Sequence, residues 1–374
     1  MFLAIRELIF AKGRFALMGL VIALIAVLGV LLTGLASGLA TAGISGLRTL
    51  PISNMAFESS ATGDLFSRST VSLSDVAAYR NEPGVLAAAP FGNQLTHAVI
   101  SSGAGKGKQI NLAMFGVDPS SFLNPVPATG SALRTGNDGI LISTAIAKEG
   151  IAVGDVITID RIGLALTVVG TVNTESFGHV GVVYAPLNIW QRVHYGLPGG
   201  LPTQALQQAT SVALQLGKSA NLTSIDVRLG LHTIIKAKTY EASPGYLAES
   251  STMSLIQGFL YVISALVVGA FFTVWTVQRK PEIALLKALG GSTRYILKDA
   301  LAQVLAVLLS ATAVGTGIGW ILGLMMPDAM PFSLEVPKVA TASGLLIILG
   351  VIGSFAAVRR ITRIDPLIAL GAQR

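Results

Sequence analysis

Four long runs of apolar residues alternate with polar segments along the chain. A helix that crosses a bilayer needs about 20 consecutive, mostly apolar residues. The four runs meet this requirement and predict membrane-spanning helices at Phe15–Leu39, Leu255–Val277, Ile296–Met326 and Val339–Val358. The first run stays uncharged as far as Leu47, so its helix is expected to continue beyond the membrane as a stalk, over residues 15–47 in all.

The segment between the first two runs, residues 48–253, has ordinary polarity and predicts one large domain in water. Its short alternating runs, such as Gln94–Ser101 and Gln109–Val117, predict strands, and the glycine-rich turn between these two predicts a hairpin. A few short helices are expected beside the strands. The predicted fold is therefore an α-helical membrane protein with four transmembrane helices and a large α+β domain of two subdomains between helices 1 and 2.

Composition supports this division. Hydrophobic residues make up 52% of the 374 residues and charged residues only 12%, which is too apolar for an ordinary soluble enzyme. The chain has no cysteine, so the α+β domain cannot rely on disulfides and must be stabilised by its own core.

The charges predict the orientation in the membrane, because lysine and arginine gather in short cytoplasmic loops. Twelve basic and four acidic residues lie in the three short segments on one side of the predicted spans, which makes this side +8. Residues 48–253 are balanced and the loop after the third span is −1, so the net charge of +7 reflects topology and gives no sign of nucleic-acid binding. Both termini are expected in the cytoplasm of a plasma-membrane protein. The expected segments are 1–14 (cytoplasmic), 15–47 (helix and stalk), 48–253 (extracellular), 254–277 (helix), 278–295 (cytoplasmic), 296–326 (helix), 327–338 (extracellular), 339–358 (helix) and 359–374 (cytoplasmic).

The first apolar run admits a second interpretation. Ala40-Thr41-Ala42 resembles the small-residue cleavage site of a signal peptide. The run before it is far longer than the 7–15 residues or so of a signal core, which favours a retained anchor. The intact mass of the mature protein distinguishes the two.

Catalytic and ion-relay patterns are not apparent in the sequence. The four histidines are scattered singly, and no set of serine, histidine and acid or of metal ligands stands at a telling spacing. The central parts of the spans carry no ionisable residue, which argues against an ion-driven transporter. Small residues recur at four-residue spacing, as in Gly34/Gly38, Ala265/Gly269, Gly315/Gly319/Gly323 and Gly353/Ala357. This spacing predicts close helix packing and, less directly, a dimer.

The segment QRKPEIALLKALGGSTRYILKDA, residues 278–300, predicts a short amphipathic helix between two spans. Pro281 and Glu282 suit its first turn, and Gly290 with Gly291 suits its end. Ile283, Leu286 and Leu289 are expected on one apolar face that seeks a groove. A partner protein would supply such a groove, whereas the alternative is a helix lying on lipid headgroups.

The stretch EIALLKALGGSTRYIL and the C-terminal Ile364–Leu370 resemble the signature of the MacB/FtsX/LolC-type, or type VII, ABC permeases. Phe115–Pro119 and Ile151–Asp155 look like that family's periplasmic domain. The resemblance implies a MacB-like permease architecture without a catalytic site of its own. It implies a homodimer with two copies of a separate HrtA-like ABC ATPase, which binds ATP and Mg. The residues implied to couple to this ATPase are Glu282, Ile283, Leu285, Leu286 and Leu289. ATP-driven motion would then pass to the outer domain along the stalk of the first span and a matching stalk that begins near Tyr246 before the second span, a mode called mechanotransmission.

Within this family, the beginning LAIRELIFAKGRFALMG and the segment Thr33–Leu39 resemble most the haem-exporter branch of the HrtB type. This implies haem as the transported substrate rather than a permanently bound cofactor. Haem iron needs an axial donor such as Met, His or Tyr. The candidate haem residues near the outer ends of the paired spans are Glu58, Met253 and Met55, with Tyr261 and Phe259 beside the ring, and Glu58 with Met253 is the expected pair of iron ligands.

Other functions are compatible with the same architecture. The chain is also suited to export another amphipathic compound or to release lipoproteins. A different class is FtsX-like signalling, in which the outer domain regulates a cell-wall hydrolase and nothing is transported. The size of residues 48–253 favours export, because an FtsX-like outer domain is usually smaller.

Overall fold

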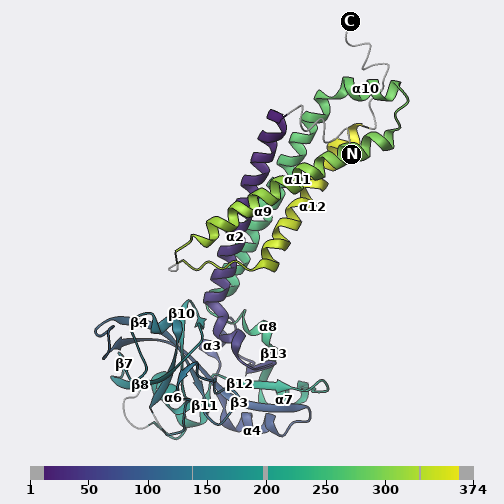
Figure 1. The fold of residues 1–374 in the computed structure, drawn as a ribbon. Coiled ribbons are helices and arrows are strands. Elements are labelled where there is room, and N and C mark those ends of the chain that lie inside the picture. The colour runs from purple at the N-terminus through teal and green to yellow at the C-terminus, as the bar shows by residue number, and fades with distance from the viewer. Residues whose placement is uncertain (1–11, 137, 197–200, 328–329, 362–374) are drawn as a thin grey trace. The chain divides into compact units, whose positions relative to one another are not determined.

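The computed structural model describes residues 12–136, 138–196, 201–327 and 330–361 (Figure 1). The chain divides into two compact units. The helical unit comprises Met1–Gly38 and Ser250–Arg374, and the sheet unit comprises Leu39–Glu249. The expectations for residues 1–11 and 362–374, among them the C-terminal motif, lie outside the described residues.

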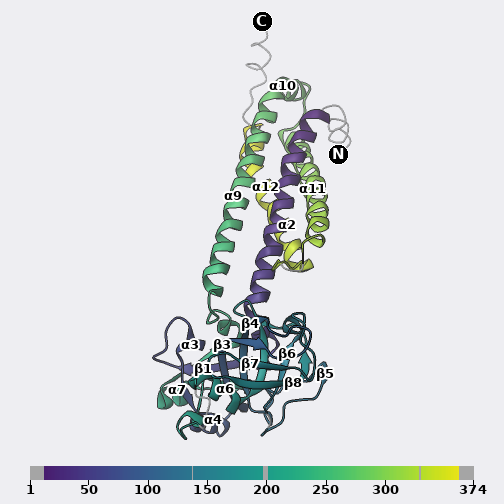
Figure 2. The same ribbon diagram turned by 90° about the vertical axis from the view of Figure 1, so that its left-hand side faces the viewer.

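The helical unit consists of long apolar helices and one short helix (Figure 2). Its helices are α2 (Lys12–Thr49), α9 (Tyr246–Gln278), α10 (Lys280–Ala288), α11 (Thr293–Leu324) and α12 (Val336–Ile361), of which α2 and α9 also contribute residues to the sheet unit. Within the described ranges, all but α10 are long and apolar enough to cross a membrane. The prediction of four spanning helices is therefore confirmed.

Glycines let these helices approach closely. Gly315 of α11 packs against Ala23 and Ala26 of α2, and a Cβ on Gly319 would lie 2.9 Å from the side chain of Val30. In α9 a Cβ on Gly269 would lie 2.6 Å from the carbonyl oxygen of Gly353 in α12. The small-residue spacing thus predicted close packing correctly for α11 on α2 and for α9 on α12.

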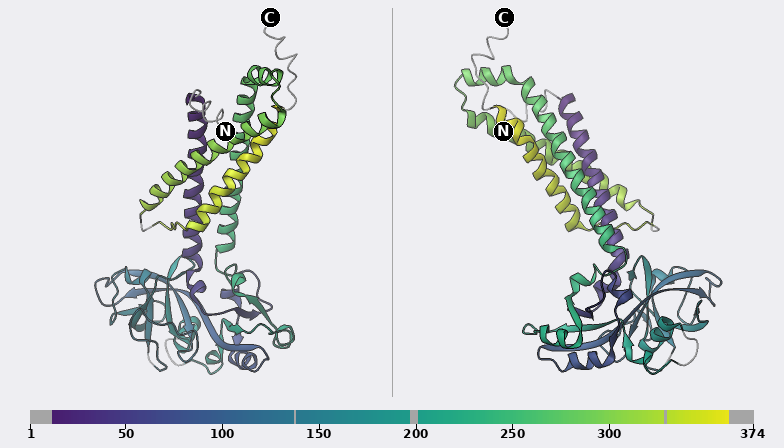
Figure 3. Two further views of the ribbon diagram at one scale, coloured as in Figure 1. Left: turned by 45° about the vertical axis from the view of Figure 1, so that its right-hand side comes forward. Right: turned by 180° about the vertical axis from the view of Figure 1, so that it is seen from behind.

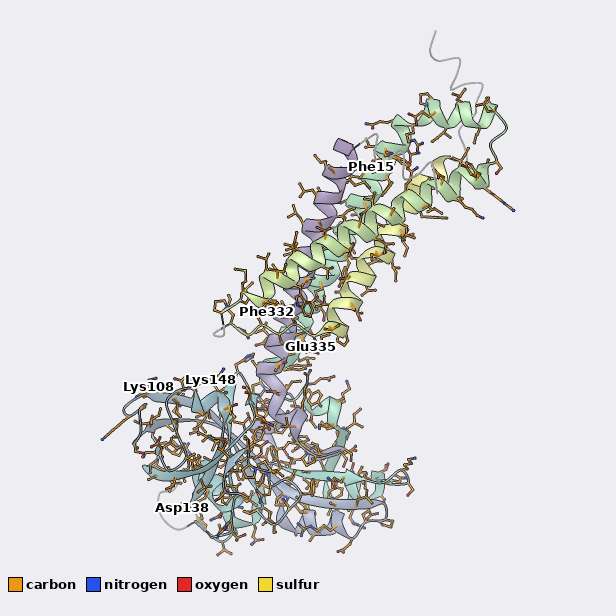
Figure 4. The ribbon with its side chains drawn as sticks, in the orientation of Figure 1. Phe15, Lys108, Asp138, Lys148, Phe332 and Glu335 are labelled. Atoms are coloured by element: carbon orange, nitrogen blue, oxygen red, sulfur yellow. The ribbon has the colours of Figure 1, made fainter. Side chains whose placement is uncertain are left out.

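Gly34 and Gly38 have a different partner from the one expected. A Cβ on Gly34 would overlap the ring of Phe332, and a Cβ on Gly38 would overlap the backbone of Pro331. Both partners belong to the loop between α11 and α12, where Figure 4 marks Phe332, and Ser333 N–H donates to Gly34 O at 3.0 Å. The prediction that these glycines serve helix–helix packing is therefore wrong: they make room for a loop.

The described residues of the sheet unit form an eleven-stranded sheet and a two-stranded one. Figures 1 and 3 show how these strands are arranged. Its strands are β1 (Asn54–Glu58), β2 (Val71–Ser72), β3 (Val85–Ile100), β4 (Gln109–Val117), β5 (Thr129–Gly130), β6 (Gly139–Ser143), β7 (Val156–Ile159), β8 (Leu164–Val172), β9 (Ser176–Phe177), β10 (Val180–Pro186), β11 (Gln208–Ala209), β12 (Ser211–Leu216) and β13 (Leu231–Ile235). The helices are α3 (Leu65–Arg68), α4 (Leu73–Arg80), α5 (Thr144–Ala147), α6 (Leu187–Tyr195), η1 (Ala205–Gln207), α7 (Thr223–Leu229) and α8 (Lys236–Thr239). These elements confirm the predicted α+β class and the β3–β4 hairpin.

Part of the large sheet closes into a barrel. Strand β3 pairs with β4, β4 with β10, β10 with β6, β6 with β8, β8 with β7, and β7 again with β3. The buried aliphatic side chains of these strands, such as Ile140, Ile157 and Leu166, form one core cluster. The first half of β3 instead pairs with β12, which continues through β1 to β13.

Two glycines on paired strands make room for the side chain of a tryptophan. Gly92 of β3 stands opposite Gly116 of β4, and a Cβ on either would overlap Trp190 of α6. Trp190 is almost completely buried there. Helix α6 can therefore lie directly on the β3–β4 pair.

Candidate functional site

Helix α10 has the local signals that the sequence predicted. Pro281 lies in its first turn, where a missing N–H costs no hydrogen bond. Leu289 is the C-cap and Gly290 follows with φ 91°, a conformation that favours glycine. Ser292 caps α11, because its hydroxyl accepts from Tyr295 N–H at 3.2 Å. The predicted short helix between two spans is confirmed.

The apolar face of α10 differs from the prediction. Ile283 is 3% exposed and Ala284 is fully buried, and Ile283 belongs to the core cluster of the helical unit with Phe272, Ile296 and Val304. Ile283 therefore serves the attachment of α10 to its own unit, and its expected place on a partner-facing surface is wrong. The side chain of Leu286 lies outside the described part of the chain.

The free edge of α10 is formed by two other leucines. Leu285 is 53% exposed and Leu289 at the C-cap is 77% exposed. They stand four residues apart, so they share a face of the helix. The side chain of Glu282 is 66% exposed near the beginning of the same helix. One side of α10 thus packs into the helical unit, while the other presents an acidic group and two leucines.

Arg279, just before α10, connects three helices. Its guanidinium group lies 4.8 Å from the ring of Trp275 in α9 and donates to Glu282 Oε2 in α10 at 2.9 Å. It also donates to Gln303 Oε1 in α11 at 3.3 Å. Gln303 is fully buried and donates in turn to Asp299 at 2.9 Å. This network fixes the direction in which α10 leaves α9.

The sequence predicted Arg279 only as a topological charge, and its role in this network was not predicted. A signal was present in the four-residue spacing of Trp275 and Arg279, which places a cation above an aromatic ring on one helix. The contact with Gln303 carried no such signal, because it joins residues that are distant in sequence.

The end of α2 is anchored inside the sheet unit. Leu47 and Leu50 are almost completely buried and lie in a cluster with Phe115 and Tyr184. A Cβ on Gly46 would lie 2.8 Å from the side chain of Val182. The Nζ of Lys236 donates to the carbonyl oxygens of Arg48 at 2.8 Å and Leu50 at 2.6 Å, which satisfies the helix C-terminus. Burial lowers the pKa of this lysine.

The haem candidates of the sheet unit lie on opposite faces of β1. Met55 is fully buried in the core beside Phe57. Haem iron cannot reach its sulfur without opening that core, so the expectation that Met55 contributes to a site is corrected by its burial. Glu58 is partly exposed at the end of β1, and its carboxylate accepts from Ser60 Oγ at 2.7 Å and from Thr70 N–H at 3.4 Å.

The other haem candidates lie on α9. Phe259 is 60% exposed, whereas Tyr261 is partly buried against the core cluster of the helical unit. Because Phe259 and Tyr261 are two positions apart on a helix, their side chains point in directions about 200° apart and do not share a face. Met253 is partly buried. It belongs to the helical unit and Glu58 to the sheet unit, so the pairing of these two residues stays a prediction. The described residues contain no group of three or more His, Cys, Asp or Glu side chains suited to hold a metal ion.

Together these features define a class of protein: a multi-pass membrane protein with an α+β domain between its first two helices and a short helix that presents a free apolar edge. Comparison with known families agrees. Residues 15–229 match the MacB-like periplasmic core domain, and residues 254–366 match the FtsX-like permease C-terminal domain. The chain therefore belongs to the MacB/FtsX-like ABC transporter permeases, which lack an ATPase domain and act with an ATPase partner.

Relatives cover the chain from end to end. It is 24% identical over 373 residues to a protein of Staphylococcus haemolyticus named as hemin transport system permease HrtB, with 99% of each chain covered. It is 24% identical over 375 residues to an ABC transporter permease of Mycobacterium tuberculosis, again with 99% of each covered. The crystal structure of the periplasmic region of MacB from Actinobacillus actinomycetemcomitans matches with a TM-score of 0.37 at 13% identity, covering 52% of this chain and 94% of the other.

Proposed function

We propose that this chain is the permease of an ATP-driven exporter that removes haem, or a similarly flat amphipathic compound, from the plasma membrane. The observation that carries the ATP-driven part is the free edge of α10, where Leu285 and Leu289 are exposed while Ile283 is buried in the helical unit. A helix held on one side and free on the other is suited to receive motion from a protein docked beneath it. The proposed partner is a separate ABC ATPase of the HrtA type, two copies of which serve a homodimer of this chain.

The charge distribution supports the proposed orientation. Basic residues gather in the segments around α10 and at both termini, which favours a cytoplasmic location for them. The sheet unit then lies outside the cell. The burial of Leu47 and Leu50 in that unit supports a mechanical link, because a helix end anchored in a core cannot move without the strands around it.

The choice of haem rests on two supports. Relatives over the full length of the chain include proteins named for hemin transport. The described spans also carry no ionisable residue in their central parts, so the substrate suited to them is one that partitions into the bilayer. We propose Met253 and Glu58 as the iron ligands, with Phe259 at the exposed face of α9.

The test is a reconstituted complex of this chain with its ATPase in proteoliposomes. Haemin is expected to stimulate ATP hydrolysis, to be exported, and to show a shifted Soret band on the wild-type permease. Met253→Ala and Glu58→Gln are each expected to weaken haemin binding about tenfold, a loss of about 1.4 kcal/mol. Met325→Ala, which removes a methionine that is 75% exposed at the C-cap of α11, is the matched control.

Three outcomes would contradict this proposal or a part of it. An unchanged Soret band and unchanged ATP hydrolysis with haemin would exclude haem as the substrate. Binding that survives in both variants would exclude the proposed ligands while leaving the substrate in place. Activation of a cell-wall hydrolase without any export would instead favour FtsX-like signalling.

A further inference from the structure

The turn between β9 and β10 has an unusual conformation. Only Gly178 and His179 connect Phe177 to Val180, and their φ angles are 57° and 67°. Two residues with positive φ give a tight hairpin turn whose twist matches the strands, but this conformation is costly for a residue with a side chain. His179 is the one residue other than glycine with positive φ in the described part of the chain. A strained residue of this kind invites the question of what its side chain does.

The backbone of this turn binds α2. Gly178 N–H donates to Gly43 O at 3.0 Å, and His179 N–H donates to Ala42 O at 3.1 Å. Beside them, Ser176 N–H donates to Ser45 Oγ at 2.8 Å. These hydrogen bonds hold the edge of α2 against the β9–β10 hairpin, just after the helix enters the sheet unit at Leu39.

The side chain of His179 binds α9. Its Nε2 lies 3.0 Å from Oε1 of Glu249, which is in the first turn of that helix. Both side chains are about one-third exposed, at 35% and 36%, so the pair is only partly screened by water. Nearby, Ser243 Oγ donates to Gly43 O at 3.1 Å. One residue, His179, therefore contacts α2 through its backbone and α9 through its side chain.

These contacts lie close to both points at which the chain passes from one unit to the other. The polypeptide passes between the helical and sheet units only twice, at Gly38/Leu39 and at Glu249/Ser250. The carbonyl oxygen of Ala42 lies a few residues after the first crossing, and Glu249 is the last residue before the second. The β9–β10 turn thus contacts the sheet-unit residues that lie close to both crossings.

We propose that the β9–β10 turn is a joint that fixes the beginning of α9 to the end of α2, and that His179 is its positioning residue. The two helices then transmit one common movement to the sheet unit instead of two independent ones. The role of this joint in transport rests on the proposed export function. The mechanical role can be measured without any substrate.

The mechanical test uses spin labels on the full-length permease in its complex with the ATPase. The chain has no cysteine, so Ala40→Cys and Ala248→Cys provide two labels without further changes. Their distance distribution is expected to be narrow in the parent protein and clearly broader in His179→Gly and in Glu249→Gln. Glycine tolerates positive φ, so His179→Gly keeps the turn and removes only the side chain.

The matched control is Glu241→Gln. Glu241 is also a partly exposed carboxylate of the sheet unit, and its ion-pair partner, at 2.8 Å, is Lys238. In the Glu241→Gln variant, the distance distribution between the two spin labels is expected to equal that of the parent protein. If the distance distributions of His179→Gly and Glu249→Gln are as narrow as that of the parent protein, the proposal of a joint is wrong.

The second measurement separates the joint from the export function. In proteoliposomes we expect ATP hydrolysis to stay within about twofold of the parent rate, while haemin exported per ATP falls at least about fivefold in both joint variants. Unchanged export per ATP would overturn the role of the joint in transport. If the parent protein exports no haemin, the export function fails, but the distance distributions still decide whether the joint exists.

Discussion

At the scale of single residues, the carboxyl group of Glu175 is buried by the fold. The residue is 6% exposed, and Tyr184 donates its hydroxyl hydrogen to Glu175 Oε2 at 2.6 Å. Burial raises the pKa of Glu175 above its ordinary value, and the hydrogen bond from Tyr184 offsets part of this effect. The pKa of Tyr184 is raised as well, mainly by burial and then by the nearby carboxylate. Tyr184 lies in the same core cluster as Leu47, near the end of α2.

This burial predicts a pH dependence of stability. The folded protein holds the proton of Glu175 more tightly than the unfolded chain does, so ionisation favours unfolding. The contribution is fully present below the ordinary pKa of a glutamate and is lost as the pH rises through the raised pKa of Glu175. Glu175→Gln, which stays neutral, is expected to show a smaller loss of Tm between about pH 4 and pH 8.

The control for this change is Glu149→Gln, at a carboxylate whose side chain is 54% exposed beside Lys108. Thermal unfolding of the full chain in detergent should show the parent pH profile for this variant. A Glu175→Gln profile that also coincides with the parent would mean that burial does not affect this carboxyl group.

At the scale of elements, the packing of α9 on α12 depends on a glycine. A Cβ on Gly353 would overlap the carbonyl oxygen of Ala265, which is backbone and cannot move aside like a flexible side chain. Gly344 of the same helix has no atom within 4 Å of a Cβ position. The two glycines therefore differ in structural role although both lie in an apolar helix.

We predict that Gly353→Leu destabilises the protein by about 1–3 kcal/mol or more, because it forces two packed helices apart. Gly344→Leu should leave Tm nearly unchanged, since its side chain enters open space. The comparison is made by thermal unfolding of both variants in the same detergent. Equal stabilities would show that close packing at Gly353 is not needed.

At the scale of the whole assembly, the proposed docking of an ATPase on α10 makes a specific prediction. Because Leu285 and Leu289 are exposed while Ile283 is buried, charged substitutions should act differently at these positions. Leu285→Asp with Leu289→Asp is expected to leave the permease folded and to weaken ATPase binding at least about tenfold, since each buried leucine contributes roughly 1.5–3 kcal/mol. Ile283→Asp should instead lower the thermal stability of the permease itself.

Co-purification of the ATPase, together with Tm of the permease, measures both effects. Leu86→Asp is the control, at a leucine of the sheet unit that is 72% exposed. A complex that survives the double substitution at Leu285 and Leu289 with full activity would show that the ATPase docks elsewhere.

Much of this architecture follows from the sequence because it depends on local composition. The four spans follow from runs of apolar residues, and the bounds of α10 follow from Pro281, Gly290 and Ser292. The orientation and the family follow from charges and motifs that can be recognised without knowing any contact. These features require only the intrinsic conformational preference of a residue or its transfer between water and lipid.

The tertiary structure decided whatever depends on distant partners. A spacing of i, i+3 and i+6 was compatible with a free face at Ile283, but packing against α9 and α11 buried that residue and left Leu285 free. The sequence predicted a strand only from Gln94 onward, because Pro90 and Gly92 are unfavourable in a strand, whereas β3 begins at Val85. The glycine at position 92 is explained by the packing of Trp190 against it. Likewise Met55 is a candidate donor by residue type but a core residue in the fold. The contacts of His179 with Ala42 and Glu249 join residues that are distant in sequence. Each of these outcomes depends on atoms brought together from remote parts of the chain, which local pattern does not specify.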